Sequence, residues 1–212
     1  MKYDEKEQRK VWDEIAEGWS NWRSQPLKEV IEFVEENKEN VGKVLDVGCG
    51  NGRNLIPFAK LGFECYGIDF SKKMIEVAKD KFKKLNLKGN FKVGNATRLQ
   101  FPSETFDYLI CIAMLHHLNK EDGEKAIKEM KRVLKNNGKG LIIVWNKYSF
   151  SHLDFVFKPK ETLIPWKRKG KIYFRYYYLY DWWELKKILE KYFKIKKTSG
   201  FFDENILFVV EK

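Results

Sequence analysis

The sequence predicts an α/β fold built on a mostly parallel sheet with helices on both of its faces. Apolar runs alternate with amphipathic helical patterns along the first two thirds of the chain, and such alternation specifies right-handed crossovers between parallel strands. A glycine-rich turn follows the first apolar run, at residues 43–47, as is typical of a strand that leads into a ligand-binding loop. In such a sheet, ligands bind at the carboxyl ends of the strands.

Each element of the first two thirds has its own local signal. Ser71 is a good N-cap, and the apolar residues that follow it recur at helical spacing. Asn137-Gly138 is expected to end a helix, and Gly140 to begin the next strand. In chain order we expect strands at 43–47, 64–69, 91–93 and 106–112, and helices at 53–61, 72–85 and 121–134.

The last quarter of the chain follows a different pattern. Asp181-Trp-Trp-Glu resembles a capping box and predicts a helix over 181–192. Strands are expected at 193–197 and 206–210, and the segment between them is too short for a crossover helix, so they should be antiparallel. We therefore expect one domain over residues 1–212, with an N-terminal helical cap over 1–40.

Residues 147–180 form an insertion that is too long for an ordinary strand-to-helix connection. The insertion contains Trp166 and an aromatic cluster at 173–178. Long insertions at the ligand end of a sheet commonly serve as lids or recognition elements, and we expect a substrate-recognition role. The alternative is an aromatic patch that only packs over the sheet edge.

The most specific motif is Asp46-Val-Gly48-Cys-Gly50-Asn-Gly52, which begins at the end of the first strand and continues into the turn after it. Glycine adopts positive φ without a Cβ clash, so the backbone can turn tightly and approach a ligand, and the next helix points its free N–H groups at that ligand. A dinucleotide-binding fingerprint would need its third glycine at Arg53. The spacing is instead acid-x-Gly-x-Gly-x-Gly.

This spacing resembles the first motif of class I S-adenosylmethionine (SAM) methyltransferases, and Asp69 stands where that fold places its ribose-binding carboxylate. A glycine turn in another α/β domain is the alternative. The resemblance implies a Rossmann-like, seven-stranded, mostly parallel sheet with an antiparallel C-terminal hairpin. It also implies SAM as the cofactor, bound by Asp46, Gly48, Cys49, Gly50, Asn51, Gly52, Asn54, Asp69, Phe70, Asn95, Ala96, Ile112 and Ala113.

Composition limits the classes of protein that fit. The N-terminus carries charges of both signs and leads into no apolar stretch, and the longest apolar run, 109–115, is far too short to span a membrane. The three cysteines, Cys49, Cys65 and Cys111, form no C-x-x-C pair, so we expect buried thiols and no metal site. A cytoplasmic protein without membrane contact is the expectation.

The net charge of +11 raises the potential for a polyanionic partner such as nucleic acid. Of the 41 basic residues seven are arginine, which leaves 34 lysines. A surface rich in lysine and glutamate is also what thermophilic adaptation produces, so charge alone leaves both interpretations open.

Several separated segments together resemble the tRNA wobble-uridine carboxymethyl methyltransferases, which esterify 5-carboxymethyluridine in the anticodon loop. The sequence departs from that family at Tyr178, where histidine is frequent, and at Asn205-Ile206, where Asn-Trp is frequent. The matching segments are Trp12-Asp-Glu-Ile-Ala, Trp22-Arg23, 46–55, Ile112-Ala-Met-Leu-His-His, 140–146, Ile164-Pro-Trp166, 175–180 and 201–205.

A carboxylate acceptor is already ionised at pH 7, so it needs placement rather than a general base. Arginine matches carboxylate geometry with two hydrogen bonds, and we expect Arg23 and Arg175 to hold the acceptor. His117, Tyr176 and Tyr177 are expected to shape the site around it. Ordinary surface or cation–π arginines are the alternative.

Two further expectations follow from the resemblance. The partners would be a tRNA anticodon loop and a small zinc-binding activator protein that pairs with an exposed sheet edge, at the strand around Phe91. A rival interpretation is a SAM methyltransferase that acts on a small molecule such as a quinone or a metabolite acid. A SAM-binding subunit without activity fits less well, because the cofactor motifs are intact.

Overall fold

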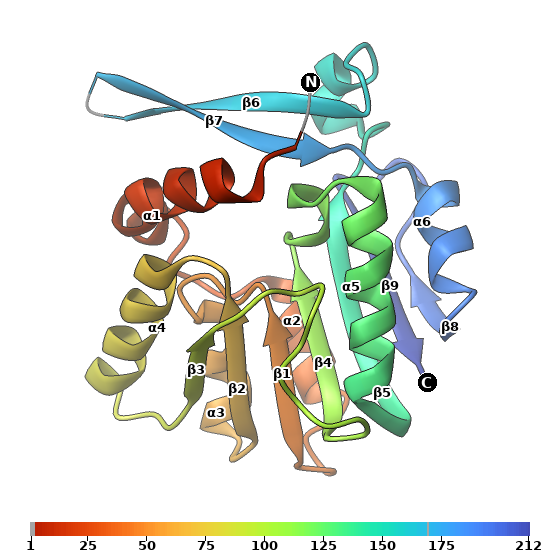
Figure 1. Ribbon diagram of the computed structural model, residues 1–212. Helices are drawn as coiled ribbons and strands as arrows, with labels where there is room; N and C mark the ends of the chain where they lie inside the picture. The colour runs from red at the N-terminus through yellow and green to blue at the C-terminus, as the bar shows by residue number, and fades with distance from the viewer. Residues whose placement is uncertain (1–2, 169) are drawn as a thin grey trace.

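The computed structural model describes residues 3–168 and 170–212. A seven-stranded sheet lies at its centre, in the order β3-β2-β1-β4-β5-β9-β8 (Figure 1). The first five of these strands pair in parallel, and β9 is antiparallel to both of its neighbours. This confirms the expected fold. The strands are β1 (Lys43–Val47), β2 (Glu64–Asp69), β3 (Asn90–Val93), β4 (Phe106–Ile112), β5 (Leu134–Trp145), β8 (Lys194–Thr198) and β9 (Asn205–Glu211).

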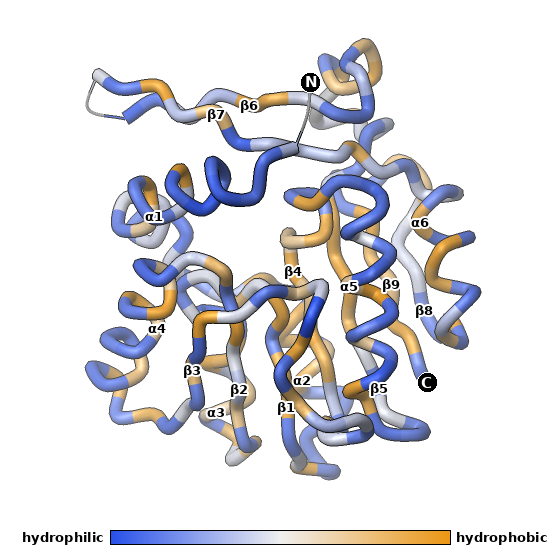
Figure 2. The backbone as a smooth tube through the Cα atoms, viewed as in Figure 1, coloured by the Kyte–Doolittle hydropathy of each residue, from blue (hydrophilic) through white to orange (hydrophobic). Residues whose placement is uncertain are grey.

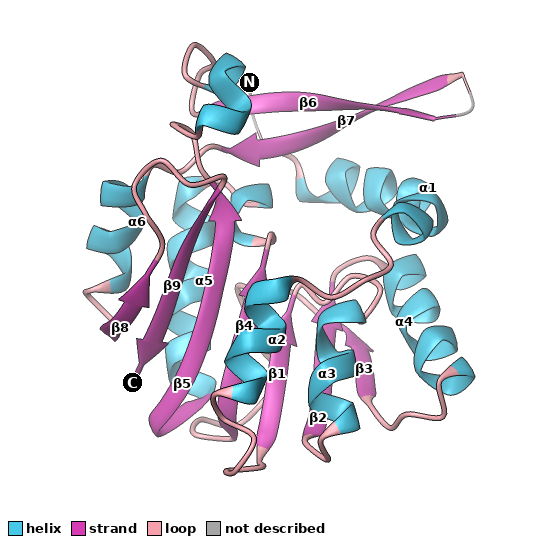
Figure 3. Cartoon of the chain, turned by 180° about the vertical axis from the view of Figure 1, so that it is seen from behind, coloured by secondary structure: helices cyan, strands magenta, loops and turns pink. Residues whose placement is uncertain are grey.

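Helices cover both faces of the sheet. One apolar core joins α2 (Lys28–Glu35), α3 (Ile56–Lys60) and α4 (Lys72–Lys84) to one face, and Figure 3 shows α2 and α3 in front of β1 and β2. A second core joins α5 (Lys120–Val133) and α6 (Trp182–Leu189) to the other face. The sheet is therefore the middle of three layers.

The central strand β4 shows why the sheet is buried on both sides. Leu109 and Cys111 belong to the core under α5, whereas Tyr108 and Ile110 belong to the core under α2. Side chains alternate between faces along a strand, so a strand covered on both faces needs a continuous apolar run. Figure 2 shows the hydrophobic residues concentrated on the strands and the hydrophilic ones on the outer surfaces of α4 and α5.

The junction between α5 and β5 differs from the prediction. The helix ends at Val133, because Leu134 is already extended, with φ −75° and ψ 136°. Strand β5 then runs without a break from Leu134, and Asn137 takes a φ of 61° inside it. The register against β4 shifts in this region, so Asn137-Gly138 form an irregularity of the strand rather than the end of the helix.

Two other predicted boundaries are also shifted. The residues after the glycine turn form a short 3-10 helix, Arg53–Leu55, before α3. The C-terminal helix α6 ends at Leu189, three residues earlier than expected. The predicted cap is real, since the Asp181 side chain accepts a hydrogen bond from the Glu184 N–H.

One helix and a two-stranded hairpin lie over the carboxyl ends of the parallel strands. Helix α1 (Glu5–Trp22) lies there, between the sheet and a hairpin formed by β6 (Glu161–Arg168) and β7 (Lys171–Tyr178) (Figure 1). The Gln8 side chain ties the helix to the hairpin, since it donates to the Phe174 carbonyl at 3.2 Å and accepts from the Tyr176 N–H at 2.9 Å. Of the expected N-terminal cap, only α1 covers the ligand end, because α2 packs on the face of the sheet.

The insertion 147–180 consists of a 3-10 helix, Phe150–Phe155, and this hairpin. Successive residues of β7 alternate between two environments, since Arg175 and Tyr177 line a cavity whereas Tyr176 and Tyr178 belong to the core shared with α5. The insertion thus both faces the ligand end and packs over the sheet. Among the described residues no helix is long and apolar enough to cross a membrane.

Candidate active site

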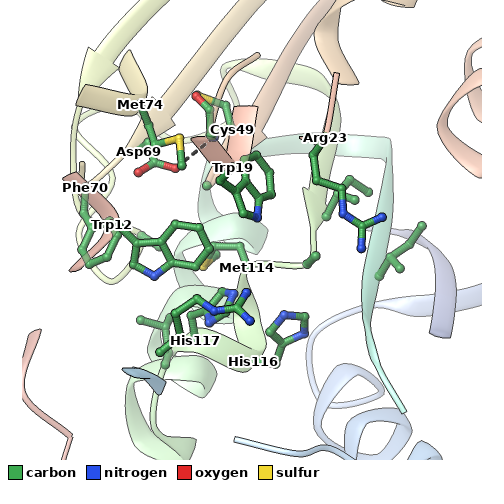
Figure 4. Close-up of a pocket in the computed structure, with 18 of the residues that line it drawn as sticks. Trp12, Trp19, Arg23, Cys49, Asp69, Phe70, Met74, Met114, His116 and His117 are labelled. Carbon is green, nitrogen blue, oxygen red and sulfur yellow. Dashed lines mark hydrogen bonds between the residues drawn. The ribbon is translucent and has the colours of Figure 1, made fainter. Parts of the chain in front are cut away.

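A cavity of about 300 Å³ lies between the carboxyl ends of β1, β2 and β4, helix α1 and the β6–β7 hairpin. Figure 4 shows Trp12 and Trp19 of α1 on one side of it, with His116 and His117 on another. Helix α1 is fixed in this position by Asp13, whose carboxylate accepts from the Ser71 hydroxyl at 2.6 Å and from the Lys73 N–H at 3.1 Å. The roof of the cavity is therefore attached to the first turn of α4.

The glycine loop has the backbone shape that its sequence requires. Gly48, Gly50 and Gly52 all have positive φ, at 78°, 50° and 73°. A Cβ on Gly48 would lie 2.1 Å from Met114 Cγ, so a larger residue would displace the floor of the cavity. The N–H groups of Gly48 and Cys49 donate to the Ile68 carbonyl, which fixes the loop against the end of β2.

Asp69 ends β2 and lies directly beneath this loop. Its Oδ2 accepts from the Gly50 N–H and its Oδ1 from the Ser71 N–H, both at 2.9 Å. Burial raises the pKa of Asp69 to about 6, against the lowering effect of these hydrogen bonds. The carboxylate lines the cavity at the end of β2.

Asp46 does not line the cavity, although it opens the same motif. Both of its carboxylate oxygens are buried and have no hydrogen-bond partner among the described residues. Burial, with the neighbouring Asp69 as a second cause, raises the pKa of Asp46 to about 8. Its carboxyl group therefore lies behind the glycine loop and is protonated in much of the free protein at pH 7.

The cavity continues past β3 and β4. The Asn95 amide donates to Glu5 Oε2 at 2.9 Å, and its oxygen accepts from the Thr97 N–H, so the side chain is held with one face toward the cavity. Ala113 has a φ of 55°, which turns the chain sharply after β4. The acid Asp69 at the end of β2, the amide Asn95 after β3 and the apolar turn at Ala113 after β4 together fit the ribose and base of a nucleoside.

Most of the cofactor residues that the sequence predicts lie in this cavity, but Asn51 and Gly52 do not. The Asn51 amide donates to the Arg23 carbonyl at 2.9 Å and so joins the loop to the end of α1. A Cβ on Gly52 would meet Phe91 and Ala78, so this glycine serves helix packing. The predicted residues that do line the cavity are Gly48, Cys49, Gly50, Asn54, Asp69, Phe70, Asn95, Ala96, Ile112 and Ala113.

Arg175 occupies the end of the cavity under the hairpin. Its guanidinium carbon lies 5.0 Å from the Trp166 ring centre and 5.3 Å from that of Tyr177. The side chain is buried, its Nε has no partner among the described residues, and burial lowers its pKa. Burial likewise raises the pKa of Tyr177 to about 12, so its hydroxyl stays protonated. This end of the site is an aromatic box around one cation.

The two histidines lie beside that box. The His117 ring is 4.4 Å from the Tyr177 ring and 4.8 Å from Trp12, and its Nδ1 is 3.0 Å from the Tyr176 carbonyl. Burial lowers the pKa of His117 to about 3 and that of His116 well below its usual range. Both rings are therefore neutral at physiological pH.

Tyr176 reaches the site only through this carbonyl. Its ring points to the opposite face of β7, where it lies 4.9 Å from the ring of Tyr3 and belongs to the core. Side chains on one strand alternate, so Arg175 and Tyr177 share the cavity face and the residue between them cannot. The tyrosine pair expected in the site thus contributes one ring, that of Tyr177.

Two further arginines line the cavity. The guanidinium carbon of Arg23 lies 4.0 Å from the centre of the Trp22 ring, and that of Arg53 lies 5.4 Å from the centre of the Trp19 ring. Burial lowers the pKa of Arg53 to about 10, and the charge of Arg23 adds to the effect. In the described part of the chain, neither has an acidic ion-pair partner. The cavity therefore offers unpaired positive charge to an anionic ligand.

Sequence reasoning missed several residues of the cavity. Trp12, Trp19 and Trp22 recur at spacings of seven and three, which places them on one face of a helix, and this signal was present in the sequence. Arg53 directly follows the glycine loop and could have been found from that position. The other lining residues that were not proposed as site residues are Tyr3, Glu5, Leu27, Ile68, Met74, Met114, Leu118, Ile143, Glu204 and Asn205.

Comparisons with known proteins indicate the family of this chain. Residues 44–138 match the methyltransferase domain family. The chain is 33% identical over 174 residues to a ubiquinone biosynthesis O-methyltransferase of Pelagibacter ubique, covering 73% of this chain and 70% of that protein. It is 36% identical over 102 residues to the methyltransferase YcgJ of Bacillus subtilis, covering 48% of this chain but only 40% of that protein.

The chain therefore belongs to the class I SAM-dependent methyltransferases, and it uses SAM as its cofactor. A SAM-dependent methyltransferase from Clostridium acetobutylicum shares the fold, with a TM-score of 0.74 at 16% identity over 94% of this chain and 98% of that one. A relative that matches along the whole length is the tRNA (carboxymethyluridine(34)-5-O)-methyltransferase of Schizosaccharomyces pombe. It is 26% identical over 242 residues, covering 100% of this chain and 99% of that protein.

The cavity fits the cofactor. Asp69 would offer acceptor oxygens to the ribose hydroxyls, and the loop of Gly48 and Gly50 would hold the methionine portion against the backbone. Asn95 and Phe70 also line the cavity and would be available to the base. When bound, SAM supplies a methyl group on a positively charged sulfur.

Proposed function

We propose that this methyltransferase esterifies the carboxylate of 5-carboxymethyluridine at the wobble position of tRNA. One observation carries the proposal: Arg175 is buried in an aromatic box, next to the cofactor cavity, with no acidic partner in the described structure. A buried cation without a partner is expensive to maintain unless a ligand anion pairs with it. A carboxylate fits the guanidinium with two parallel hydrogen bonds.

The neutral histidines support a carboxylate over a hydroxyl acceptor. A hydroxyl must lose its proton during methyl transfer and needs a general base. His116 and His117 have strongly lowered pKa values, so they are poor bases. A carboxylate is ionised already, and its oxygen takes the methyl group while the sulfur keeps the electron pair of the broken bond, so no proton moves.

The three arginines of the cavity have different roles in this proposal, because they lie at different places in it. Arg53 adjoins the glycine loop, and burial together with the charge of Arg23 lowers its pKa. These two arginines are therefore placed to attract the carboxylate of the methionine portion. Arg175 is on the hairpin, between Trp166 and Tyr177. In this proposal Arg175 holds the acceptor, and Arg23 neutralises charge between the two anions.

The hairpin supports an RNA substrate. Its segment 161–178 contains five basic residues and one acidic residue, Glu161. Near its tip Lys167 pairs across the strands with Ile172, and Pro165 pairs with Phe174, and all four are exposed. Figure 2 shows the tip as hydrophilic and projecting past α1. An exposed phenyl ring on a hairpin whose tip carries the exposed Lys167 and Lys171 suits stacking on unpaired bases and contact with phosphates.

An activator partner is also part of the proposal. Strand β3 is at the sheet edge, as expected, and its apolar residue Val93 is 47% exposed. A small zinc-binding protein that adds a strand there would cover this edge and lie close to Asn95 in the cavity. The requirement would appear as activity that rises when such a protein is added.

A transfer assay tests the function. The purified protein, SAM and an anticodon stem-loop with 5-carboxymethyluridine at the wobble position should yield the methyl ester, detected by mass spectrometry of the nucleosides. The matched control is the same stem-loop with uridine, which lacks the acceptor. Because a ubiquinone biosynthesis O-methyltransferase is among the relatives, a quinone-type small molecule is the rival acceptor. Transfer to that small molecule and none to the RNA would replace the proposal.

A further inference from the structure

His116 and His117 are neighbours in a short 3-10 helix, Leu115–His117, and their ring centres are 4.6 Å apart. Both rings line the cavity and lie against Tyr177, which stacks on His116 at 5.1 Å and meets the edge of His117 at 4.4 Å. Figure 4 shows the two side chains next to each other on one wall of the cavity. Each ring uses one nitrogen to bind the protein backbone, and the two backbone bonds are of opposite kinds.

His116 accepts a hydrogen bond at Nδ1. The donor is the backbone N–H of Trp145, at 3.1 Å, and a backbone N–H can only donate. Nδ1 must therefore carry the lone pair, so in the neutral ring the proton is on Nε2. The Nε2–H has no partner among the described residues.

His117 has the opposite arrangement. Its Nδ1 lies 3.0 Å from the backbone carbonyl of Tyr176, and a carbonyl can only accept. Nδ1 must therefore carry the proton, and Nε2 keeps the lone pair. In the described part of the chain Nε2 has no donor. Burial, more than the nearby charge of Arg175, keeps both rings neutral and so preserves the difference.

We infer that His116 and His117 present a hydrogen-bond donor and an acceptor side by side, and that this pair binds the edge of a nucleobase that offers a carbonyl next to an N–H, as uracil does. The His116 Nε2–H donates to the base carbonyl, and the base N3–H donates to His117 Nε2. The inference rests on the proposed function, because this base is the one that carries the acceptor carboxylate.

The same geometry separates the base from its carboxylate. The lone pair of His117 repels a carboxylate oxygen, which has no proton to donate, so the acceptor group is directed away from the histidines and toward Arg175. Buried polar groups that lack their partners discriminate strongly between substrates, because an analogue without the N–H leaves the acceptor unpaired. The pair thus selects the base, and the arginine selects its substituent.

The tautomers can be measured without any substrate. Long-range ¹H–¹⁵N correlation spectra of the full chain, with its three histidines labelled and assigned from His116→Gln and His117→Gln variants, report which ring nitrogen carries the proton. We expect protonated Nε2 in His116 and protonated Nδ1 in His117 at pH 7. The same tautomer in both residues would overturn the inference.

Substrate recognition is tested with two stem-loops that carry 5-carboxymethyluridine with and without a methyl group on N3. N3-methylation should lower kcat/KM roughly 10- to 100-fold. His117→Phe keeps an aromatic ring at this position but removes the ring nitrogens, the acceptor among them. The kcat/KM of this variant should therefore differ little between the two RNAs. Trp12→Phe, which also packs on His117, should retain the discrimination.

Three outcomes are informative. Equal rates on both RNAs with the parent protein would refute recognition of the N3–H. Discrimination that survives in His117→Phe would assign it to another residue and would also overturn the inference. Failure of the proposed function looks different, because neither RNA is then methylated. In that case the tautomers measured by NMR decide by themselves whether the donor–acceptor pair exists.

Discussion

The carboxylate of Asp69 joins the end of β2 to the glycine loop, since its Oδ2 accepts the backbone N–H of Gly50 at 2.9 Å. This hydrogen bond connects the 46–52 motif to Asp69, the two sequence features that predicted the cofactor. The oxygens also face the cavity, where ribose hydroxyls would bind. One side chain therefore both shapes the loop and binds the ligand.

Asp69→Ala should weaken SAM binding strongly. The substitution removes charge-assisted hydrogen bonds to the ribose, each worth about 1.5–3 kcal/mol, and releases the loop. Calorimetry with SAM and with its demethylated product measures the loss. Asp107→Ala is a matched control, because Asp107 also accepts a backbone N–H, that of Lys43 at 2.9 Å, but at the end of β1 far from the glycine loop. Equal SAM affinity in the parent and Asp69→Ala proteins would refute the ribose assignment.

Asp46 predicts a pH dependence of stability. Its folded-state pKa of about 8 is above the value of an unfolded aspartate, so between these pH values the folded protein holds a proton that the unfolded chain has lost. The Asp46 contribution to the free energy of unfolding should therefore fall as pH rises from about 6.5 to 8, by up to about 1.4 kcal/mol per pH unit. Above pH 8 this decline should level off, because the carboxyl group is then ionised in both states.

Urea unfolding of the protein without SAM, at several pH values, measures this slope. His116 and His117 titrate near pH 6.5 in the unfolded chain, so they contribute an opposite slope up to about pH 7.5, and this slope is the same in the parent and Asp46→Asn proteins. Asp46→Asn keeps the size of the side chain and cannot ionise, so it should remove the Asp46 contribution to the slope and stabilise the protein at pH 8. A slope that is the same in both proteins would place the titrating group elsewhere.

The glycine loop and Asp69 could be predicted from sequence because their constraints are local. Positive φ at Gly48 and Gly50 is needed wherever a strand turns sharply into a ligand, and the loop directly follows β1. Asp69 ends an apolar run, and parallel strands bring their carboxyl ends to one edge. No knowledge of distant packing was required.

The position of Tyr176 could not be predicted in the same way. It depends on β7 being a strand, and the long insertion gave no clear strand pattern. Once the hairpin is known, alternation places Arg175 and Tyr177 together and turns Tyr176 into the core. The lining by Trp12 and Trp19 likewise depends on how α1 packs over the sheet, which is a tertiary property.

The tip of the hairpin provides a test of RNA binding. Lys167→Glu combined with Lys171→Glu should weaken tRNA binding and make the log–log salt dependence shallower, by roughly 0.7 for each phosphate that the protein no longer neutralises. SAM affinity should not change, because neither lysine lines the cavity. Lys79→Glu with Lys83→Glu on α4 changes the net charge equally and is the matched control. An equal decrease of affinity in both variants would show a general effect of charge rather than a binding surface.

Arg175→Lys tests the carboxylate mechanism most directly. Lysine keeps the charge but loses the planar pair of donors, so SAM affinity should be retained while kcat on carboxymethyluridine RNA falls about 10- to 100-fold. Arg168→Lys is the matched control on the same hairpin, since its guanidinium lies against Gly18 of α1 and not in the cavity. With saturating SAM, kcat of the parent enzyme should be nearly flat from about pH 6 to 9, because the acceptor is ionised throughout and His117, with its pKa of about 3, stays neutral. A rate that rises tenfold per pH unit, together with full activity in Arg175→Lys, would instead indicate a hydroxyl or amine acceptor whose proton must be removed.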